Sequence, residues 1–237
     1  MSWNSKTDYC GLAVEGKIII KSATQNKSGQ YLEKHGKSGA ICATKPFGEA
    51  SAPSCDYAIK GAKSFAAGDI KLGAVTSITV GNVTKRYALA SVRYENGADA
   101  EPTYTGTAQE IEATSDGTQR TFDVPAFAVS PDEAAEIIMS AATVAGTGCE
   151  LTRCTMEASA NVKLHTVNGV IVSSDVTAGH VVVSLEILQS GDTEPTVTAG
   201  SGWDISSPLT NTDPDAEFPT WSCELTKPLA YTTGSNS

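Results

Sequence analysis

Side chains that could take part in catalysis are present, but their spacing matches no defined chemical motif. The segment His35-Gly36-Lys37-Ser38 ends like a phosphate-binding loop. Such a loop needs four residues between its first Gly and the Gly-Lys pair, with a helix after it. Here six residues separate Gly29 from Gly36, and no helical pattern follows. We therefore predict no nucleotide site and assign no cofactor-binding residue.

The sequence does not predict a metal site. His35, His165 and His180 lie in different segments, without His-x-His or His-x-x-x-His spacing. The acidic residues at 213–217 offer oxygen ligands for Ca²⁺, but the segment lacks the Gly and the terminal Glu of an EF-hand loop. We expect an acidic turn there and assign no metal ligand.

Paired carboxylates keep a hydrolase open as a minor alternative. Glu110 lies two residues before Glu112, and Asp213, Asp215 and Glu217 form a second group. A glycosidase needs two carboxylates facing across a cleft, and an aromatic content of 6% leaves few rings to stack on a sugar. We assign no catalytic residue and expect that the protein is not an enzyme.

The cysteines favour free thiols over a metal site or a disulfide framework. No pair has Cys-x-x-Cys spacing, and the N-terminal residues lack the apolar stretch of a secretory signal. We expect buried free thiols, although an even number of cysteines leaves disulfides open. The six are Cys10, Cys42, Cys55, Cys149, Cys154 and Cys223.

Composition predicts a folded, mainly β protein. Hydrophobic residues make up 40% of the 237 residues and charged residues 19%, which is ordinary for a globular chain. Short runs rich in Val and Thr are bounded by Gly, Pro, Asn and Asp, the pattern of an all-β protein. No run approaches the roughly 18 apolar residues of a membrane span. We expect no membrane span, and synthesis in the cytoplasm.

Charge is distributed unequally along the chain. Residues 1–86 carry a net charge of +6, whereas residues 87–237 carry −16. One interpretation is two separately solvated surfaces. The other is self-assembly, in which the basic part of one subunit meets the acidic part of the next. Specific nucleic-acid binding fits less well, because the lysines are dispersed and are not interleaved with aromatic residues.

A short motif appears twice and predicts a tandem repeat. Glu101-Pro102-Thr103 is matched by Glu194-Pro195-Thr196, 93 residues later, and each copy follows an alternating strand-like segment. We predict an N-terminal basic region at 1–53, a first β repeat at 54–148, and a second at 149–237 that ends in a mobile tail. In the second repeat, strands are expected at 154–164, 169–176, 179–189, 195–205 and 218–225.

Two further elements are expected at defined places. Within residues 1–53, short strands at 12–21 and 40–44 flank a polar loop or flexible hairpin at 22–39. One flanking α-helix is expected at about 131–142, since Ser130 suits an N-cap, Pro131 suits the first helical position, and acids follow. The aromatic residues Trp203, Trp221 and Phe218 lie in predicted strands, where we expect core or subunit-interface packing.

Several of these features together resemble β-rich structural proteins of tailed bacteriophages, most nearly tail tube and related tail proteins. They are residues 72–75 (Leu-Gly-Ala-Val), the Glu-Pro-Thr strand, the Ser-Pro-capped segment and residues 146–149 (Gly-Thr-Gly-Cys). The resemblance implies a β-sandwich or barrel fold. It also implies that subunits form rings, that the rings stack, and that DNA passes through the lumen of the stack. This chain differs from proteins that carry two equivalent tube domains, because no helix is expected in its second repeat.

The sequence therefore predicts a structural component of a phage virion, made in the bacterial cytoplasm, with no enzymatic activity. Its expected partners are copies of itself, other virion tail proteins, and DNA that passes through a lumen without specific binding. The alternative is a receptor-binding or glycan-binding β module of the fibre or adhesin type.

Overall fold

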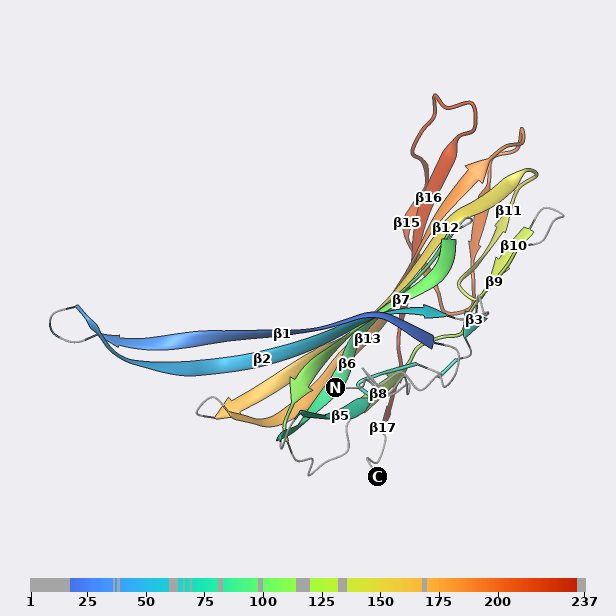
Figure 1. Cartoon of the computed structure of the whole chain (residues 1–237). Helices are drawn as coiled ribbons and strands as arrows, with labels where there is room; N and C mark the ends of the chain where they lie inside the picture. The colour runs from blue at the N-terminus through green and yellow to red at the C-terminus, as the bar shows by residue number, and fades with distance from the viewer. Residues whose placement is uncertain are drawn as a thin grey trace.

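The chain, in a computed structural model, is built from antiparallel β-strands (Figure 1). The structure describes residues 18–35, 37, 39–59, 64–65, 67–68, 70–80, 83–97, 100–113, 120–131, 136–167 and 170–233. These residues form seventeen strands and no helix, which confirms the predicted mainly β class. In the described part of the chain, no helix is long and apolar enough to cross a membrane.

Nine strands form one large sheet. In the order of their hydrogen-bonded neighbours, these are β1 (Ile18–His35), β2 (Ile41–Ile59), β7 (Ala100–Ile111), β6 (Val83–Gly97), β12 (Cys149–Val167), β13 (Val170–Gln189), β16 (Thr220–Pro228) and β15 (Asp204–Asn211), with β5 (Val75–Val80) paired to β6.

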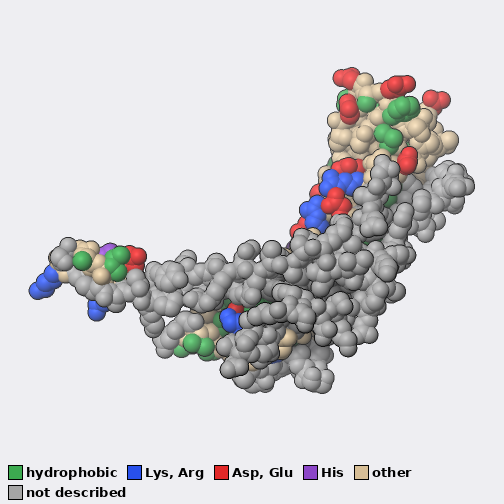
Figure 2. All heavy atoms as spheres, viewed as in Figure 1, with side chains coloured by type: hydrophobic (Ala, Val, Ile, Leu, Met, Phe, Trp, Pro, Cys, Tyr) green, Lys and Arg blue, Asp and Glu red, His purple; other side chains and the backbone are tan. Residues whose placement is uncertain are grey.

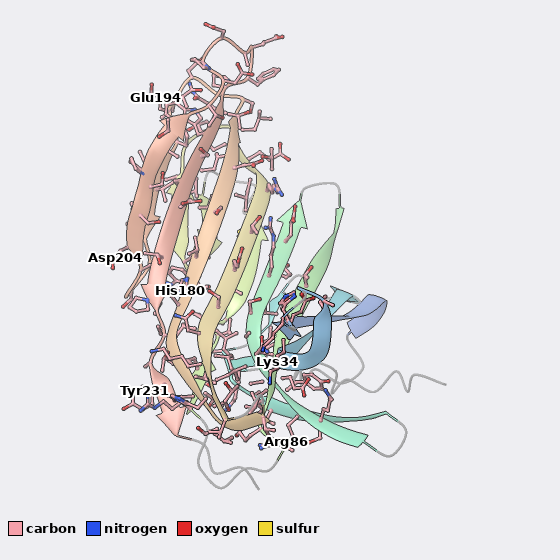
Figure 3. The ribbon with its side chains drawn as sticks, turned by 90° about the vertical axis from the view of Figure 1, so that its left-hand side faces the viewer. Lys34, Arg86, His180, Glu194, Asp204 and Tyr231 are labelled. Carbon is pink, nitrogen blue, oxygen red and sulfur yellow. The ribbon has the colours of Figure 1, made fainter. Side chains whose placement is uncertain are left out.

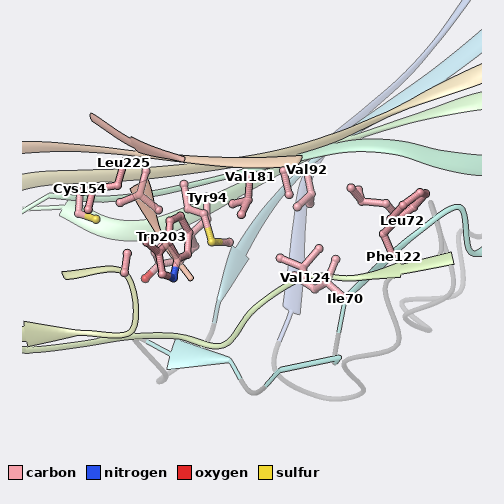
Figure 4. Packing of buried hydrophobic residues seen from close by; sticks show 14 of the residues in the cluster. Ile70, Leu72, Val92, Tyr94, Phe122, Val124, Cys154, Val181, Trp203 and Leu225 are labelled. Carbon is pink, nitrogen blue, oxygen red and sulfur yellow. The ribbon is translucent and has the colours of Figure 1, made fainter. Parts of the chain in front are cut away.

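Two smaller sheets complete the fold. A five-stranded sheet has the order β14 (Thr196–Ala199), β11 (Ala142–Ala145), β10 (Glu136–Met139), β9 (Phe127–Pro131) and β3 (Ser64–Phe65). A three-stranded sheet has the order β17 (Tyr231–Thr233), β8 (Arg120–Asp123) and β4 (Lys71–Leu72). Figure 4 shows the buried side chains between the large sheet and the chain segments that face it.

Alternation along the central strands produces this core. On β13, Val181, Val183, Leu185 and Ile187 are all buried, while the residues between them lie on the opposite face. Each fully buried aliphatic side chain contributes roughly 1.5–3 kcal/mol. A shift by one residue would bring Glu186 into the core, so the apolar pattern sets the register.

β13 is one strand, where two strands were expected on either side of residues 177–178. A β-bulge lies at this point: Ala178 has a φ of 55°, and the pairing with β12 shifts between Ser159 and Asn161. Phe122 packs over Gly179, where an added Cβ would lie 2.5 Å from the Phe122 Cδ1 atom. The bulge thus lets the strand continue and leaves room for an aromatic ring.

β1 and β2 form a long hairpin that projects from the rest of the molecule (Figure 1). Residues 54–58 of β2 pair with β7, but residues 25–53 pair only with each other among the described strands. We call residues 25–53 the arm. Strands are present at 18–21 and 41–44, within the expected 12–21 and 40–44, but both are much longer than expected. The polar loop at 22–39 was wrong and the alternative of a hairpin is nearer, because residues 22–35 pair across a hairpin with residues 41–56.

The predicted helix at 131–142 is wrong for the residues that the structure describes. β10 and β11 form a hairpin there, with Ile137 opposite Val144 and Ile138 opposite Thr143. β9 and β14 pair on its two sides, so contacts distant in sequence override the local helix signals. Asp132 and Glu133, the acids that favoured a helix start in the sequence, belong to residues 132–135, which lie outside the described part.

The two copies of the Glu-Pro-Thr motif have different structural settings. Residues 101–103 belong to β7, which pairs with β6 in the large sheet. Residues 194–196 lead into β14, which pairs with β11 in the five-stranded sheet. The tandem repeat is therefore not confirmed, and strands from 54–148 and from 149–237 share the large sheet and one core.

Part of the expected mobile C-terminal tail is ordered. Residues 231–233 form β17, which pairs with β8, while 234–237 lie outside the described residues. The Arg120 guanidinium lies 5.2 Å from the centre of the Tyr231 ring, and Phe122 meets the same ring edge to face at 6.5 Å. Sequence patterns could not reveal a strand whose partner lies about 110 residues away.

We predict that Gly179→Ala lowers the free energy of unfolding by about 1–3 kcal/mol, because the added methyl group would overlap the Phe122 ring. Denaturant titration measures the change. Ala178→Gly is the control, since it alters the same bulge without adding atoms and relieves the positive φ. Equal stability of Gly179→Ala and the unaltered protein would contradict the packing described here.

Candidate functional site

The face of the large sheet opposite the core, which we call the outer face, carries a connected row of charges. Arg153 lies between two acids: its Nη2 atom is 2.7 Å from the Glu95 Oε1 atom, and its Nη1 atom is 3.5 Å from the Glu186 Oε1 atom. Arg93 lies 3.7 Å from Glu95 and 3.9 Å from Glu157. We call these five residues the ion-pair row; Figure 2 shows Lys or Arg side chains next to Asp or Glu side chains on the body of the molecule.

Strand register brings the members of the row together. Arg93 on β6 is directly opposite Glu157 on β12, and Arg153 on β12 is directly opposite Glu186 on β13. Cross-strand pairs of opposite charge stabilise a sheet modestly, by roughly 0.2–1 kcal/mol each. The pKa of Arg153 is raised, chiefly by its hydrogen bond to Glu95. The row therefore orients its side chains but adds little stability.

A hollow of about 470 Å³ lies over this face and is lined partly by the ion-pair row. Beside the row, Ser184 donates a hydrogen bond to Glu224 at 3.3 Å, and the Ser159 hydroxyl lies 3.2 Å from the His180 Nε2 atom. Acids outnumber basic residues in the lining, with Glu157, Glu186 and Glu224 against the two arginines. The hollow is thus a polar surface with an excess of negative charge.

The arm tip contains the segment that resembled a phosphate-binding loop. Lys34, His35 and Lys37 are exposed there, while Gly36 and Ser38 lie outside the described residues. The His35 Nδ1 atom is 3.1 Å from the Gly39 carbonyl oxygen, and its Nε2 atom is 3.6 Å from Glu33. β2 begins at Ile41, so a strand follows the turn where a phosphate-binding loop requires a helix.

Exposed acids gather at one end of the large sheet. The loops at 190–195 and 212–219 contain five acids and neither Lys nor Arg. Asp213, Asp215 and Glu217 lie in the turn between β15 and β16, and Glu194 lies before β14. Figure 3 places Glu194 at this end and Tyr231 toward the other. We call the loops 190–195 and 212–219 the acidic end.

The structure forms an acidic turn at residues 213–217, as expected. The Asp213 backbone N–H donates to the Asn211 Oδ1 atom at 3.0 Å, which stabilises the turn locally. Among the described residues, no three His, Cys, Asp or Glu side chains are grouped so that they could hold a metal ion. His35, His165 and His180 lie on β1, β12 and β13 respectively.

The predicted carboxylate pair Glu110 and Glu112 contacts two separate cations. Lys85 Nζ lies 2.8 Å from Glu110 Oε1, and Arg86 Nη1 lies 3.7 Å from Glu112 Oε1. Glu112 is buried, and its Oε2 atom has no hydrogen-bond partner among the described groups. The geometry pairs each acid with a basic residue of β6.

The predicted aromatic residues have different environments. Trp203 is in the core, as expected. Trp221 is half-buried, and its Nε1–H donates to the Gln189 Oε1 atom at 2.8 Å. Phe218 is exposed by 48%, beside the acidic turn. Packing within the chain therefore accounts for the two tryptophans but leaves Phe218 available to a partner.

The ion-pair row was absent from the sequence-based predictions. Its signal was the period-two spacing of Arg93 with Glu95 and of Arg153 with Glu157, which places each pair on one face of a strand. Which strands are neighbours depends on pairing over about 60 residues, and this spacing alone does not encode that pairing. The row therefore became visible only with the sheet order.

Three cysteines are free thiols, in agreement with expectation. Cys154 and Cys223 are buried, and Cys149 is half-buried. The side chains of Cys10, Cys42 and Cys55 lie outside the described part. Burial raises the pKa of Cys154 to about 12 and that of Cys223 to about 11. Both thiols therefore remain protonated at neutral pH, which suppresses nucleophilic reactivity.

We predict that iodoacetamide at pH 8 modifies Cys154 and Cys223 only after unfolding. A thiol with a pKa near 12 is ionised in about one molecule in ten thousand at this pH, and burial also blocks access. Peptide mass spectrometry reads each position separately, and half-buried Cys149 serves as the internal comparison. Native labelling of Cys154 as fast as in the unfolded chain would refute this assignment.

Comparison with known proteins supplies no relative, since the chain matches no protein-family model and no curated protein sequence. Function must therefore be inferred from the arm, the outer face and the acidic end.

Proposed function

We propose that this protein is a structural subunit that assembles with copies of itself, as a tail tube or tail-associated component of a phage virion. The observation that carries the proposal is the arm, which extends from the sheet without another described strand beside it. At about 3.3 Å per residue, residues 25–35 alone span about 36 Å. An element of this length can reach well into a neighbouring subunit.

Energetic considerations favour an intermolecular role for the arm. An isolated two-stranded hairpin is marginally stable in water, because it has no third strand and no apolar layer against it. Its outer edges also present unpaired backbone N–H and C=O groups, which are a template for pairing with another chain. Contacts with a second subunit would stabilise the hairpin and would pair the backbone groups at its edges.

The distribution of charge supports repeated contacts between subunits. The basic residues are concentrated in residues 1–86, a region that includes the arm, and the excess of acids lies in residues 87–237. Contact between two different surfaces is heterologous, and such contacts produce closed rings or open filaments. Complementary potentials would set the register of that contact.

The virion assignment rests on the resemblance to tail proteins noted from residues 72–75, the Glu-Pro-Thr strand, the Ser-Pro-capped segment and residues 146–149, of which the Ser-Pro segment does not form the expected helix over its described residues. In this proposal, subunits form rings that stack, other tail proteins contact the ends, and DNA passes an acidic inner surface without specific binding. The chain contributes to construction and carries out no catalysis.

Removal of the arm tests the proposal. Joining Thr24 to Ser54 through an Asn-Gly turn deletes residues 25–53 and retains the pairing of β2 with β7. We expect the full chain to form large species that sediment faster as concentration rises, and the deletion variant to remain a folded monomer. Circular dichroism verifies folding, and assembly of the deletion variant equal to that of the full chain would contradict the role of the arm.

A glycan-binding or receptor-binding module is the second candidate, favoured by the exposed Phe218 ring beside Asp215 and Glu217 at a loop end. An exposed ring with neighbouring carboxylates can stack on a sugar and accept its hydroxyl hydrogen bonds. A glycan array tests this candidate. If this candidate function is right, the unaltered protein binds glycans on the array and Phe218→Ala lowers the binding signal at least about tenfold. The candidate function is rejected if the unaltered protein gives no signal.

A further inference from the structure

We infer that the hollow on the outer face receives Lys34 and Lys37 from the arm tip of a second copy. This inference rests on the proposed self-assembly and specifies where the arm docks. The hollow supplies carboxylates at fixed positions, and the arm tip supplies exposed ammonium groups.

The carboxylates of the hollow retain capacity for another cation. Glu224 accepts a hydrogen bond from Ser184, which carries no charge. Glu157 lies 3.9 Å from Arg93, a distance longer than a hydrogen bond. Glu186 shares Arg153 with Glu95, and Glu95 has the closer contact, 2.7 Å against 3.5 Å. Three carboxylates therefore line one concave surface with only partial charge compensation.

The arm tip provides a matching cation. Lys34 and Lys37 are exposed, and neither forms an ion pair with another described residue. A lysine ammonium group is a compact charge with three donors on a flexible stem, so it can enter an open hollow and bind several carboxylate oxygens. A volume of about 470 Å³ leaves room for such side chains.

The arm of the same chain lies away from the hollow. Figure 2 shows the arm tip at one extreme of the molecule and the ion-pair row on the body, with open space between them. The lysines must therefore come from another copy. The contact is heterologous, because the tip of each copy would fill the hollow of the next.

The acidic end is the competing destination for these lysines, and the hollow is favoured by its shape. The acids of the acidic end lie on exposed turns, whereas the hollow gathers Glu157, Glu186 and Glu224 around one concave surface, although Glu157 and Glu224 are exposed too. The hollow is lined by four members of the ion-pair row, all but Glu95, together with the Ser159 and His180 side chains. Carboxylates already oriented by neighbouring residues lose less freedom on binding.

Paired charge reversals test the inference by sedimentation velocity at low salt. We expect the tip variant Lys34→Glu/Lys37→Glu and the hollow variant Glu157→Lys/Glu224→Lys each to weaken association about tenfold or more, because like charges would then face each other. Combining all four substitutions should restore at least half of the decrease in the logarithm of the association constant. Lys163→Glu and Glu217→Lys are the matched controls, exposed residues elsewhere that should leave association within about twofold.

Zero-length carbodiimide cross-linking gives an independent reading. In a mixture of ¹⁴N-labelled and ¹⁵N-labelled full chain, we expect mixed-isotope peptides that join Lys34 or Lys37 to Glu157, Glu186 or Glu224. Intermolecular cross-links from these lysines to Asp213, Asp215 or Glu217 instead, with weakened association of Glu217→Lys, would overturn docking in the hollow. Assembly that is insensitive to the tip and hollow reversals would also overturn it and leave self-assembly intact. A full chain that stays monomeric would overturn the proposed function together with the inference.

Discussion

Alternation along β6, β12, β13 and β16 is the constraint on which the rest of the structure depends. Residues such as Tyr94, Met156 and Leu185 are buried on one face, and the residues between them form the outer face. Because burial sets the register, it also determines which outer-face residues lie opposite one another. Core packing and the ion-pair row are therefore two results of the same strand pairing.

The same pairing leaves the arm without a third strand among the described residues. The buried residues that the structure describes lie between Ile70 and Leu225, while β1 and β2 project from the rest of the molecule (Figure 1). Among the described strands, residues 25–53 pair only with each other, and a hairpin without a third strand is marginally stable. An arm with unpaired outer edges is the basis for proposing self-assembly, and the hollow, whose carboxylates are only partly compensated, is the surface on which we infer that its tip docks.

Predictions from the sequence were most accurate where one periodic segment carried the information. Alternation located most of the second-half strands within a few residues, but the bulge at Ala178 joined two of them. The single strand expected at 195–205 was wrong, because a turn at 201–202 separates β14 from β15, which belong to different sheets. The helix at 131–142 was wrong because Ser130 and Pro131 are local signals that distant pairing with β14 overrode. The ion-pair row and β17 were missed because both depend on contacts between distant residues.

Cryo-electron microscopy of the concentrated full chain tests the central claim most directly. The account predicts rings, tubes or other repeating assemblies in which the β1–β2 hairpin of each subunit lies against the adjacent copy. Monodisperse monomers at every concentration and salt condition, with no density for a second chain beside the hairpin, would contradict it.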